Sequence, residues 1–463
     1  MINQSLTVTF LLVLSIAGGC TSLPSYRPEL PEDIGDKGLV VAQVTGIDQL
    51  RWWSSNKEVL IDDRKQGVII NGFIALPLTA GDHELSGLFQ SNGESIPAGA
   101  GSLTSIHTTR MPLQRKFTIR PRQITNLGLI VLYPDPNDKE RKGFLCLFVD
   151  NTGDMKHFLK ATYPVLAAKL NADSMTLAPG NMMPANLFPA LRKELAVKET
   201  VAKEEITPGR TVTYIATDIG TLAEISKSSD GKIIGVKLID VPTVSNIQSV
   251  SPNYVKDRFA FLTTSNRLFV VTGGAVAERD LPRGLLAPQV YVLGTNDLVI
   301  IDDKFQIYTS YDDGHRWQPY LGSMTENPVR AKLAPAANGY YVYTTHPVRV
   351  FFGPYGRVDF RQVDIPQDLK DLDILHDTAT GLFVELRYAS FGFIESKPRQ
   401  FFIRPTGKAN WESRSMPATN CMRIKYLEDD GLRLSTECGK YSVWGDEARQ
   451  RYASSDGGKT WRK

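Results

Sequence analysis

The octet Ser454-Ser455-Asp456-Gly457-Gly458-Lys459-Thr460-Trp461 nearly repeats Ser310-Tyr311-Asp312-Asp313-Gly314-His315-Arg316-Trp317. Both octets read Ser-x-Asp-x-Gly-x-x-Trp. This spacing predicts a tight turn in which the Asp carboxylate accepts backbone N–H groups and the Gly adopts a positive φ. We expect each Trp to pack between neighbouring sheets. The positions with a predicted structural role are Ser310, Asp312, Gly314, Trp317, Ser454, Asp456, Gly458 and Trp461.

Weaker copies of this pattern extend the repeat in both directions. Segments such as Val241-Pro242, Leu281-Pro282 and Met416-Pro417 end comparable units, and the ends fall near 242, 282, 321, 366, 417 and 463. The intervals of roughly 39 to 51 residues match a four-stranded propeller blade with its loops, which gives about six blades over 206–463. An ordinary β-sandwich is the alternative for such short strands, and the paired octets favour the propeller.

The octets resemble the Asp-box, or bacterial neuraminidase repeat, of sialidases, sortilin-type receptors and photosystem-assembly factors. The box is structural in those families, so the resemblance implies a β-propeller and identifies no ligand. The expected fold class is mainly all-β: a small β-sandwich, a helical connector and a roughly six-bladed propeller.

The beginning of the chain predicts its cellular location. Leu6 to Ala17 is an apolar run of about 12 residues, too short to span a bilayer but suited to a signal peptide. It leads into Gly18-Gly19-Cys20, which resembles a bacterial lipobox, although that family prefers Leu where Ala17 stands. The resemblance implies a signal peptide over 1–19, acylation of Cys20 and, because Thr21 replaces Asp, sorting to the outer membrane, facing the periplasm or the surface. Plain secretion with an unmodified Cys20 is the alternative.

Residues 20–37 carry Pro24, Pro28 and Pro31 and predict an extended tether. Short strands follow over 38–150. Leu78-Thr79-Ala80-Gly81-Asp82-His83-Glu84-Leu85 resembles the PEGA-type small β-sandwiches of bacterial envelope lipoproteins. No second His or Cys accompanies His83 at metal-ligand spacing, so we interpret it as a strand residue beside a turn and predict no metal.

A helical connector is expected over 151–205. Apolar residues repeat at helical spacing from Asp154 to Leu170, with a break at Pro164. The mixed charges of Arg192 to Glu205 predict an exposed helix.

Cysteine positions predict one disulfide. A hairpin turning at Glu428-Asp429-Asp430-Gly431 would pair Leu427 with Leu432 and place Cys421 opposite Cys438. A pair of free thiols is the alternative. Cys146 is expected to be a buried strand thiol.

Charge and motifs exclude several functions. The 463-residue chain has 53 basic and 50 acidic side chains, a formal charge of +3, which predicts no nucleic-acid partner. A sialidase-like glycoside hydrolase is the enzymatic alternative, because sialidases use three arginines, a Tyr/Glu pair and an Asp. The family's Arg-Ile-Pro signature is missing from this chain. The candidate residues are scattered along the sequence: Arg267, Arg387, Arg404, Tyr341, Tyr388, Glu385 and Asp373.

We therefore assign no catalytic residue and no cofactor. The sequence favours a non-enzymatic envelope lipoprotein, attached to the membrane through Cys20. Its propeller is expected to bind a protein partner or a surface glycan, as a scaffold or assembly factor.

Overall fold

The structure is a computed structural model of the chain. It describes residues 28–46, 57–69, 72–98, 101–134, 144–180, 182–183, 188–193, 212–217, 219–228, 232–251, 258–285, 288–302, 304–321, 331–336, 339–345, 348–354, 360–366, 372, 374–378, 381–385, 400–405, 410–418, 421–427, 433–438, 441–442, 445–446 and 450–463. The contacts divide the chain into two compact units, 1–152 with 162–182 and 153–161 with 183–463. Within the described ranges, no helix is long and apolar enough to cross a membrane.

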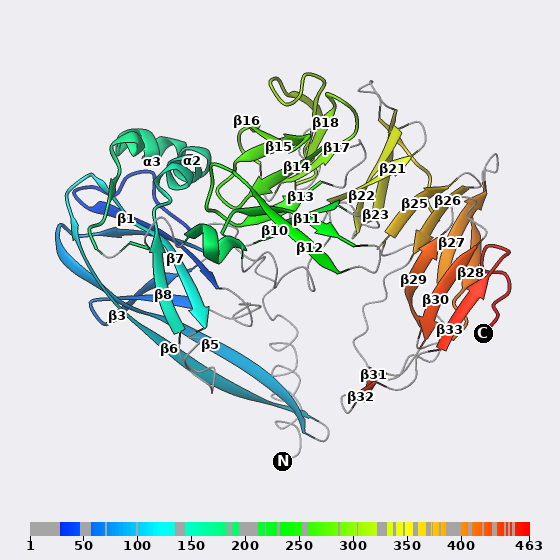
Figure 1. The fold of residues 1–463 in the computed structure, drawn as a ribbon, viewed down its shortest axis with the longest axis horizontal. Coiled ribbons are helices and arrows are strands. Elements are labelled where there is room, and N and C mark those ends of the chain that lie inside the picture. The colour runs from blue at the N-terminus through cyan, green and yellow to red at the C-terminus, as the bar shows by residue number, and fades with distance from the viewer. Residues whose placement is uncertain are drawn as a thin grey trace, which may run out of the picture. The chain divides into compact units, whose positions relative to one another are not determined.

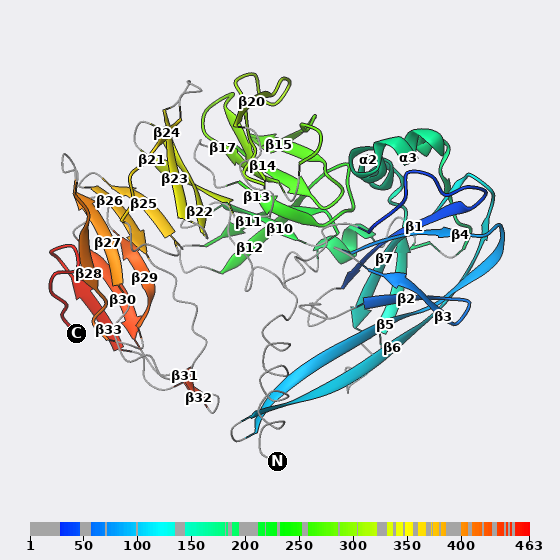
Figure 2. The ribbon, with the colours of Figure 1, turned by 180° about the vertical axis from the view of Figure 1, so that it is seen from behind.

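The first unit contains two sheets. One has the strand order β4-β1-β7-β8, with β9 also paired to β7 (β1 Gly38–Gly46, β4 Phe73–Leu78, β7 Ile124–Pro134, β8 Phe144–Val149, β9 Thr176–Leu177). The other has the order β3-β2-β5-β6 (β2 Lys57–Ile61, β3 Arg64–Val68, β5 Gly81–Ala98, β6 Gly101–Ile119). In Figures 1 and 2, β5 and β6 continue as a two-stranded ribbon beyond the rest of their sheet.

A single apolar core joins these two sheets. Val40 and Ile130 of the first sheet pack in one cluster with Val59, Leu85 and Phe117 of the second. Alternate residues of β6 between Met111 and Ile119 face this core, as the two-residue period of a strand requires. The predicted β-sandwich is confirmed, because two sheets that share one buried face form that architecture.

His83 lies at the turn that begins β5. Its Nδ1 is 2.7 Å from Oδ2 of Asp62, and its Nε2 is 3.0 Å from the carbonyl oxygen of Thr79. Burial lowers the pKa of His83, but these two acceptors outweigh burial and hold it above its ordinary value. Both ring nitrogens therefore serve the turn, in agreement with the structural interpretation of this histidine.

Two helices and a 3-10 turn follow the sandwich strands: α2 Thr152–Thr162, α3 Pro164–Lys169 and η2 Ala172–Ser174. The predicted break at Pro164 separates α2 from α3. Apolar residues of the expected stripe are buried on both helices, among them Met155, Phe158 and Leu166. Residues 153–161 of α2 make their contacts within the second unit.

The segment around Arg192 differs from the exposed helix that the charges predicted. Residues 188–193 are helical, and the half-buried Arg192 donates to the carbonyl oxygens of Gly220 and Thr243. The prediction was wrong for Arg192 because a sequence does not show which carbonyl groups its guanidinium will meet. The rest of that predicted helix, 194–205, lies outside the described residues.

Six successive antiparallel sheets form the second unit, and we call them blades 1 to 6 (Figure 1). Their strands are as follows: blade 1, β10 Val212–Thr217, β11 Thr221–Lys227, β12 Ile233–Ile239; blade 2, β13 Ile247–Val250, β14 Arg258–Thr263, β15 Leu268–Thr272, β16 Ala275–Arg279; blade 3, β17 Gln289–Val292, β18 Leu298–Ile301, β19 Ile307–Ser310, β20 Gln318–Leu321; blade 4, β21 Ala331–Ala336, β22 Gly339–Thr345, β23 Val348–Pro354, β24 Arg361–Gln362; blade 5, β25 Ile374–Thr378, β26 Gly381–Glu385, β27 Gln400–Pro405, β28 Glu412–Ser415; blade 6, β29 Cys421–Leu427, β30 Leu434–Cys438, β33 Gln450–Ser454. A short hairpin, β31 Tyr441–Ser442 with β32 Gly445–Asp446, lies between β30 and β33 in the chain.

Five apolar clusters join each blade to the next. Phe261 belongs to the cluster between blades 1 and 2, Val292 to that between blades 2 and 3, and Val342 to that between blades 3 and 4. Phe402 lies between blades 4 and 5, and Phe401 between blades 5 and 6. Successive meanders of three or four described strands, packed face to face, are the architecture of a propeller, so the all-β fold class is confirmed.

The disulfide between Cys421 and Cys438 is confirmed, and the two residues are register partners on β29 and β30. The predicted partner of Leu427 was wrong: Leu427 pairs with Leu434, not with Leu432. Register shifts on either side of Ile424 absorb the difference. The expected strand thiol, Cys146, is half-buried on β8, and burial raises its pKa to about 11.

Candidate functional site

The two octets fold into nearly identical turns. In the first, the Ser310 hydroxyl accepts the N–H of Gly314 at 2.8 Å, and the Asp312 carboxylate accepts the N–H of Arg316 at 2.8 Å. In the second, Ser454 accepts from Gly458 at 2.8 Å and Asp456 accepts from Thr460 at 2.9 Å. Each of these bonds joins residues only four positions apart, so each octet builds its own turn.

Hydrogen bonds within the turns lower the pKa of both aspartates. The hydroxyl and the N–H of Thr460 hold the pKa of Asp456 well below its usual range. The N–H of Arg316 lowers the pKa of Asp312. Both carboxylates are therefore ionised acceptors that are already occupied, and neither is available as a general acid at neutral pH.

Each octet places its Trp across the seam to the preceding blade. The Trp317 indole N–H donates to the carbonyl oxygen of Asp280 in blade 2 at 2.7 Å, and the Trp461 indole N–H donates to that of Ser415 in blade 5 at 3.0 Å. Blade 5 has no octet, yet its Trp411 donates in the same way to Asp364 of blade 4 at 3.0 Å. In every case the accepting residue stands two positions before a Pro, which gives a structural reason for the repeat ends seen in the sequence.

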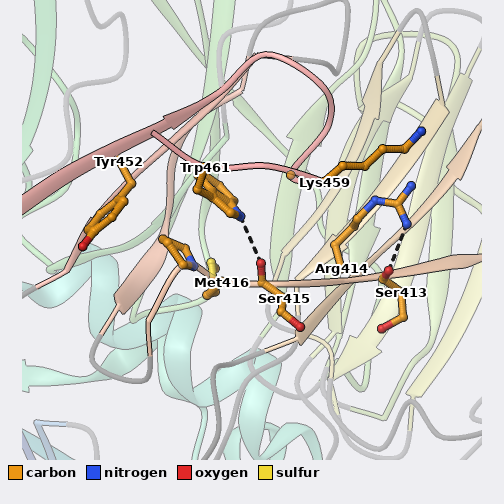
Figure 3. A pocket seen from close by; sticks show the side chains of 9 residues that line it. Ser413, Arg414, Ser415, Met416, Tyr452, Lys459 and Trp461 are labelled. Carbon is orange, nitrogen blue, oxygen red and sulfur yellow. Dashed lines mark hydrogen bonds between the residues drawn. The ribbon is translucent and has the colours of Figure 1, made fainter. Parts of the chain in front are cut away.

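An open pocket of about 590 Å³ lies at the seam between blades 5 and 6 (Figure 3). Blade 5 contributes β28 and the segment after it, and blade 6 contributes Tyr452 of β33 and the second octet. Because β28 is the outermost strand of its sheet, it pairs with β27 alone among the described strands. The lining residues are Ser413, Arg414, Ser415, Met416, Pro417, Tyr452, Gly458, Lys459 and Trp461.

The pocket has an apolar wall and a cationic side. Met416, Tyr452 and Trp461 belong to the blade 5–6 cluster and line the wall. Figure 3 shows the side chains of Arg414 and Lys459 extending side by side, away from this wall. None of the lining residues is acidic. The arrangement suits a ligand that is partly apolar and carries a negative charge.

The hydrogen bonds of Arg414 leave part of its guanidinium unused. Its Nη2 is paired with the Glu412 carboxylate, and its Nη1 donates to the Ser413 carbonyl oxygen at 2.9 Å. The Nε is buried and has no hydrogen-bond partner among the described residues. Lys459 is exposed and forms no ion pair within the described part of the chain. The Arg414 guanidinium and the Lys459 ammonium are therefore the cationic donors that line the pocket.

The seam between blades 2 and 3 is closed where the blade 5–6 seam is open. There the Asp313 carboxylate is paired with both Arg258 and Arg279, and the Nε of Arg279 also donates to the Asp313 carbonyl oxygen at 2.7 Å. Burial lowers the pKa of Arg258, although Asp313 opposes this effect. Asp313 has a φ of +64°, and the equivalent residue of the second octet is Gly457 with a φ of +68°.

The candidate residues for sialidase chemistry are placed in structural roles where the structure describes them. Arg267 donates to Asp154 of α2 at 2.8 Å and forms a two-point ion pair with Glu278. Tyr341 is buried between blades 4 and 5. Arg404 stacks on Trp411, with 5.2 Å between its Cζ and the ring centroid.

Glu385 is the last residue of β26. Arg387, Tyr388 and Asp373 lie outside the described residues. Across the ranges that the structure describes, no three His, Cys, Asp or Glu side chains group closely enough to hold a metal ion.

Asp154 is the most fully bonded carboxylate that sequence reasoning missed. It is buried and accepts hydrogen bonds from the Thr243 hydroxyl and the Val244 N–H, each at 2.8 Å, and from the Ser245 N–H at 3.1 Å. Together with Arg267, these groups fasten α2 to blades 1 and 2. No sequence signal identifies this network, because its members are about 90 to 113 residues apart.

The pocket residues Arg414, Lys459 and Tyr452 were also not predicted. The sequence did contain one usable signal, a constant distance between an arginine and the proline that ends a blade. Arg414 and Arg279 each lie three residues before such a proline. If the arginine at this position is assumed to lie beside the octet of the next blade, Arg414 and Lys459 are predicted to be neighbours.

Comparison with known proteins gives only distant likenesses. No family model matches the chain, and no curated protein matches it significantly. Similar solved structures include YCF48 bound to D1 peptide, at 16% identity over 56% of this chain and 79% of that chain, with a TM-score of 0.40. YCF48 from Cyanidioschyzon merolae is 14% identical over 54% of this chain and 80% of that one, with a TM-score of 0.39.

The Niastella koreensis GH74 enzyme is 12% identical, with a TM-score of 0.37; the match covers 55% of this chain and 43% of that chain. Likenesses at this level carry no argument about ligand or reaction. The fold of this chain follows from the order and stacking of its own sheets.

Proposed function

We propose that this protein is a non-enzymatic, lipid-anchored protein of the outer membrane whose propeller binds a protein partner at the blade 5–6 pocket. The pocket carries the proposal. It combines an apolar wall with cationic donors in an open recess, which is the composition of a binding site.

The rigidity of the pocket supports binding as its role. The second octet fixes the backbone beside Lys459 through hydrogen bonds, and the Trp461 indole is held by Ser415. A preorganised surface loses little conformational entropy when a partner binds. Donors on such a scaffold fit recognition better than hydrolysis by a pair of carboxyl groups, because no Asp or Glu lines the pocket.

Membrane attachment is proposed from the Gly18-Gly19-Cys20 motif, which lies outside the described residues. Intact-mass analysis of the wild type and of Cys20→Ala tests it. We expect the mature wild type to begin at Cys20 with added acyl mass and the variant to lack that mass. An unmodified wild type would contradict the anchor and leave the binding site untouched.

Site-specific photocrosslinking tests the binding site. A photoreactive amino acid replaces the exposed Ser413 in the full-length chain, and the same group at the exposed Lys237 on β12 of blade 1 is the matched control. In intact envelopes, we expect one stoichiometric protein adduct from position 413 that position 237 does not give. Equal labelling from both positions, or none from 413, would contradict a partner at this pocket.

A glycoside hydrolase is the competing function, and no described residue favours it. The ion pairs of Arg267 use that side chain within the fold, and the aspartates of the octets serve their turns. A hydrolase would have to release sugar from a fluorogenic sialoside, which is a direct check on this alternative.

A further inference from the structure

The seam between blades 2 and 3 contains an internal template for the ligand of the blade 5–6 pocket. Two observations make the seams equivalent. Arg279 immediately precedes Asp280, which accepts the Trp317 indole, and Arg414 immediately precedes Ser415, which accepts the Trp461 indole. The two arginine side chains are also equally exposed, at 15% each.

The backbone contacts of the two arginines agree as well. Nη1 of Arg279 donates to the carbonyl oxygen of Glu278 at 2.9 Å, and Nη1 of Arg414 donates to that of Ser413 at 2.9 Å. Each guanidinium is therefore anchored to the preceding residue of its own outer strand. What differs is the group that the other guanidinium nitrogens meet.

In the blade 2–3 seam that group is an aspartate within a polypeptide. Arg279 binds the Asp313 carboxylate through Nη2 and Nε, and the same Nε binds the Asp313 main-chain carbonyl oxygen at 2.7 Å. In the second octet the equivalent residue is Gly457, which has no carboxylate. The Nε of Arg414 is accordingly left buried without a described partner.

We infer that the blade 5–6 pocket binds an aspartate residue of an extended partner segment, which takes the place that Asp313 holds in the blade 2–3 seam. The inference rests on the proposed function and names the chemistry of its partner. The Arg414 guanidinium, part of which Glu412 now holds, and the Nζ of Lys459 donate to the incoming aspartate, and the wall at Trp461 and Met416 receives an apolar neighbour.

The charges around the pocket agree with a single incoming carboxylate. Blade 5 has Glu412 where blade 2 has Ala277, and this acid is already paired with Nη2 of Arg414. Lys459 stands where the first octet has His315, so it adds a permanent cation. Lys463 adds a further cation beside the pocket, with its Nζ 5.9 Å from the Tyr452 ring centroid, so the surroundings balance an incoming carboxylate.

A protein segment fits this template better than an acidic sugar. The group that Arg279 binds and that the blade 5–6 seam lacks is the side-chain carboxylate of an amino acid, because Gly457 differs from Asp313 only in its side chain. The lining residues include no Asp, Glu, Asn or Gln, the side chains that pair with neighbouring sugar hydroxyls.

Gly457→Asp is the deciding variant, because it restores the internal carboxylate at a backbone position where Asp313 shows that Asp is accepted. Gly457→Asn is the matched control, which has the same shape and no charge. The probe is a fluorescent, capped heptapeptide of Val and Thr with one central Asp, measured by anisotropy on the full-length protein in detergent. The same peptide with Asn replaces it in a parallel titration.

We expect the Asp peptide to bind at least about tenfold more tightly than the Asn peptide. Gly457→Asp should lose this binding by a similar factor, and Gly457→Asn should retain it. Glu412→Gln, which removes the internal competitor for Arg414, should bind the Asp peptide more tightly than the wild type. A thermal melt within a few degrees of wild type shows that each variant is folded.

The inference would be overturned by no saturable binding of the Asp peptide up to about 1 mM, by equal binding of the Asp and Asn peptides, or by full binding by Gly457→Asp. Saturable binding of a fluorescent glucuronic-acid oligosaccharide without any binding of the Asp peptide would assign the pocket to an acidic glycan instead. If position 413 still crosslinks its partner in Gly457→Asp, the aspartate inference fails while the proposed function stands.

Discussion

The seams between blades 2 and 3 and between blades 5 and 6 share the same octet turn, and a main difference between them is Asp313 in the first and Gly457 in the second. Both contain the octet turn, the Trp that reaches the preceding blade and an arginine next to the residue that accepts the indole. Asp313 closes the first seam with two ion pairs, whereas Gly457 leaves the second with a pocket. The same turn therefore forms ion pairs across one seam and lines a pocket in the other.

The largest expected effect comes from removing the Asp313 carboxylate. Asp313→Asn keeps the turn shape but removes the carboxylate that is paired with the buried Arg258 and with Arg279. We expect a loss of about 3 kcal/mol in the free energy of unfolding, because breaking a buried ion pair leaves an uncompensated charge. Urea denaturation measures it. Gly457→Asn is the control in the other seam, and an equal loss there would show that the ion pairs are not the cause.

The two octet glycines should differ in their tolerance of a side chain. A Cβ on Gly458 would overlap the fully buried Phe401 ring, whereas a Cβ on Gly314 would lie 3.1 Å from Leu298 and 3.2 Å from the stem of Arg279. Both positions have a positive φ. We expect Gly458→Ala to cost about 3 kcal/mol and Gly314→Ala about 1–2 kcal/mol. Thermal denaturation of both proteins checks the order, and the reverse order would refute the packing argument.

Replacing Trp461 by Phe tests the indole bond by itself. Phe retains the ring but cannot donate to the Ser415 carbonyl oxygen, so we expect a loss of about 1 kcal/mol. Blade 4 provides a natural reference, because Phe360 occupies the Trp position there and its backbone N–H bonds the Tyr320 hydroxyl instead. Unfolding of Trp461→Phe, compared with Trp317→Phe in the closed seam, measures the bond. No change in either variant would show that ring packing alone holds the seams.

The smallest effect is expected in acid. The pKa of Asp456 is lowered chiefly by Thr460, whose hydroxyl bonds the carboxylate at 2.6 Å, while Arg316 lowers the pKa of Asp312 through its N–H and its charge and has no hydroxyl to donate. A lowered carboxylate pKa contributes stability that is present above the unfolded value of about 3.9 and is lost as the pH falls below it.

Thr460→Val should therefore reduce the acid-induced loss of stability between about pH 4 and pH 2. Thermal melts of wild type and variant across that range test this expectation. Arg316→Thr in the first octet is the complementary variant and should increase the acid sensitivity there. A Thr460→Val protein with the same acid profile as wild type would contradict the role of the hydroxyl.

Local features of this protein were predictable from its sequence. The octet turns form from residues at most four positions apart, so the motif spacing alone indicates their hydrogen bonds. The period of the repeat ends indicated the blades. The turn between Cys421 and Cys438 led to the right disulfide, even though two register shifts displaced the pairing of Leu427.

The long-range features were not predictable in this way. The partners of Asp154 are 89 to 113 residues away along the chain, and Arg192 meets the carbonyl oxygens of Gly220 and Thr243. In the sequence, Arg192 belongs to a mixed-charge segment like many exposed helices. Only packing shows that its guanidinium is half-buried against the propeller.

The sequence by itself determined the repeating unit of this protein, the turn at each octet and the chemistry of its disulfide, because these depend on short-range spacing and on turn geometry. The tertiary structure alone decided that Arg414 and Lys459 border one pocket and that Asp313 fills the equivalent space elsewhere. Arg414 and Lys459 are on different blades, and only the stacking of sheets brings them together. Whether a seam is closed or open depends on which side chains face each other across it, and that pairing exists only in the folded chain.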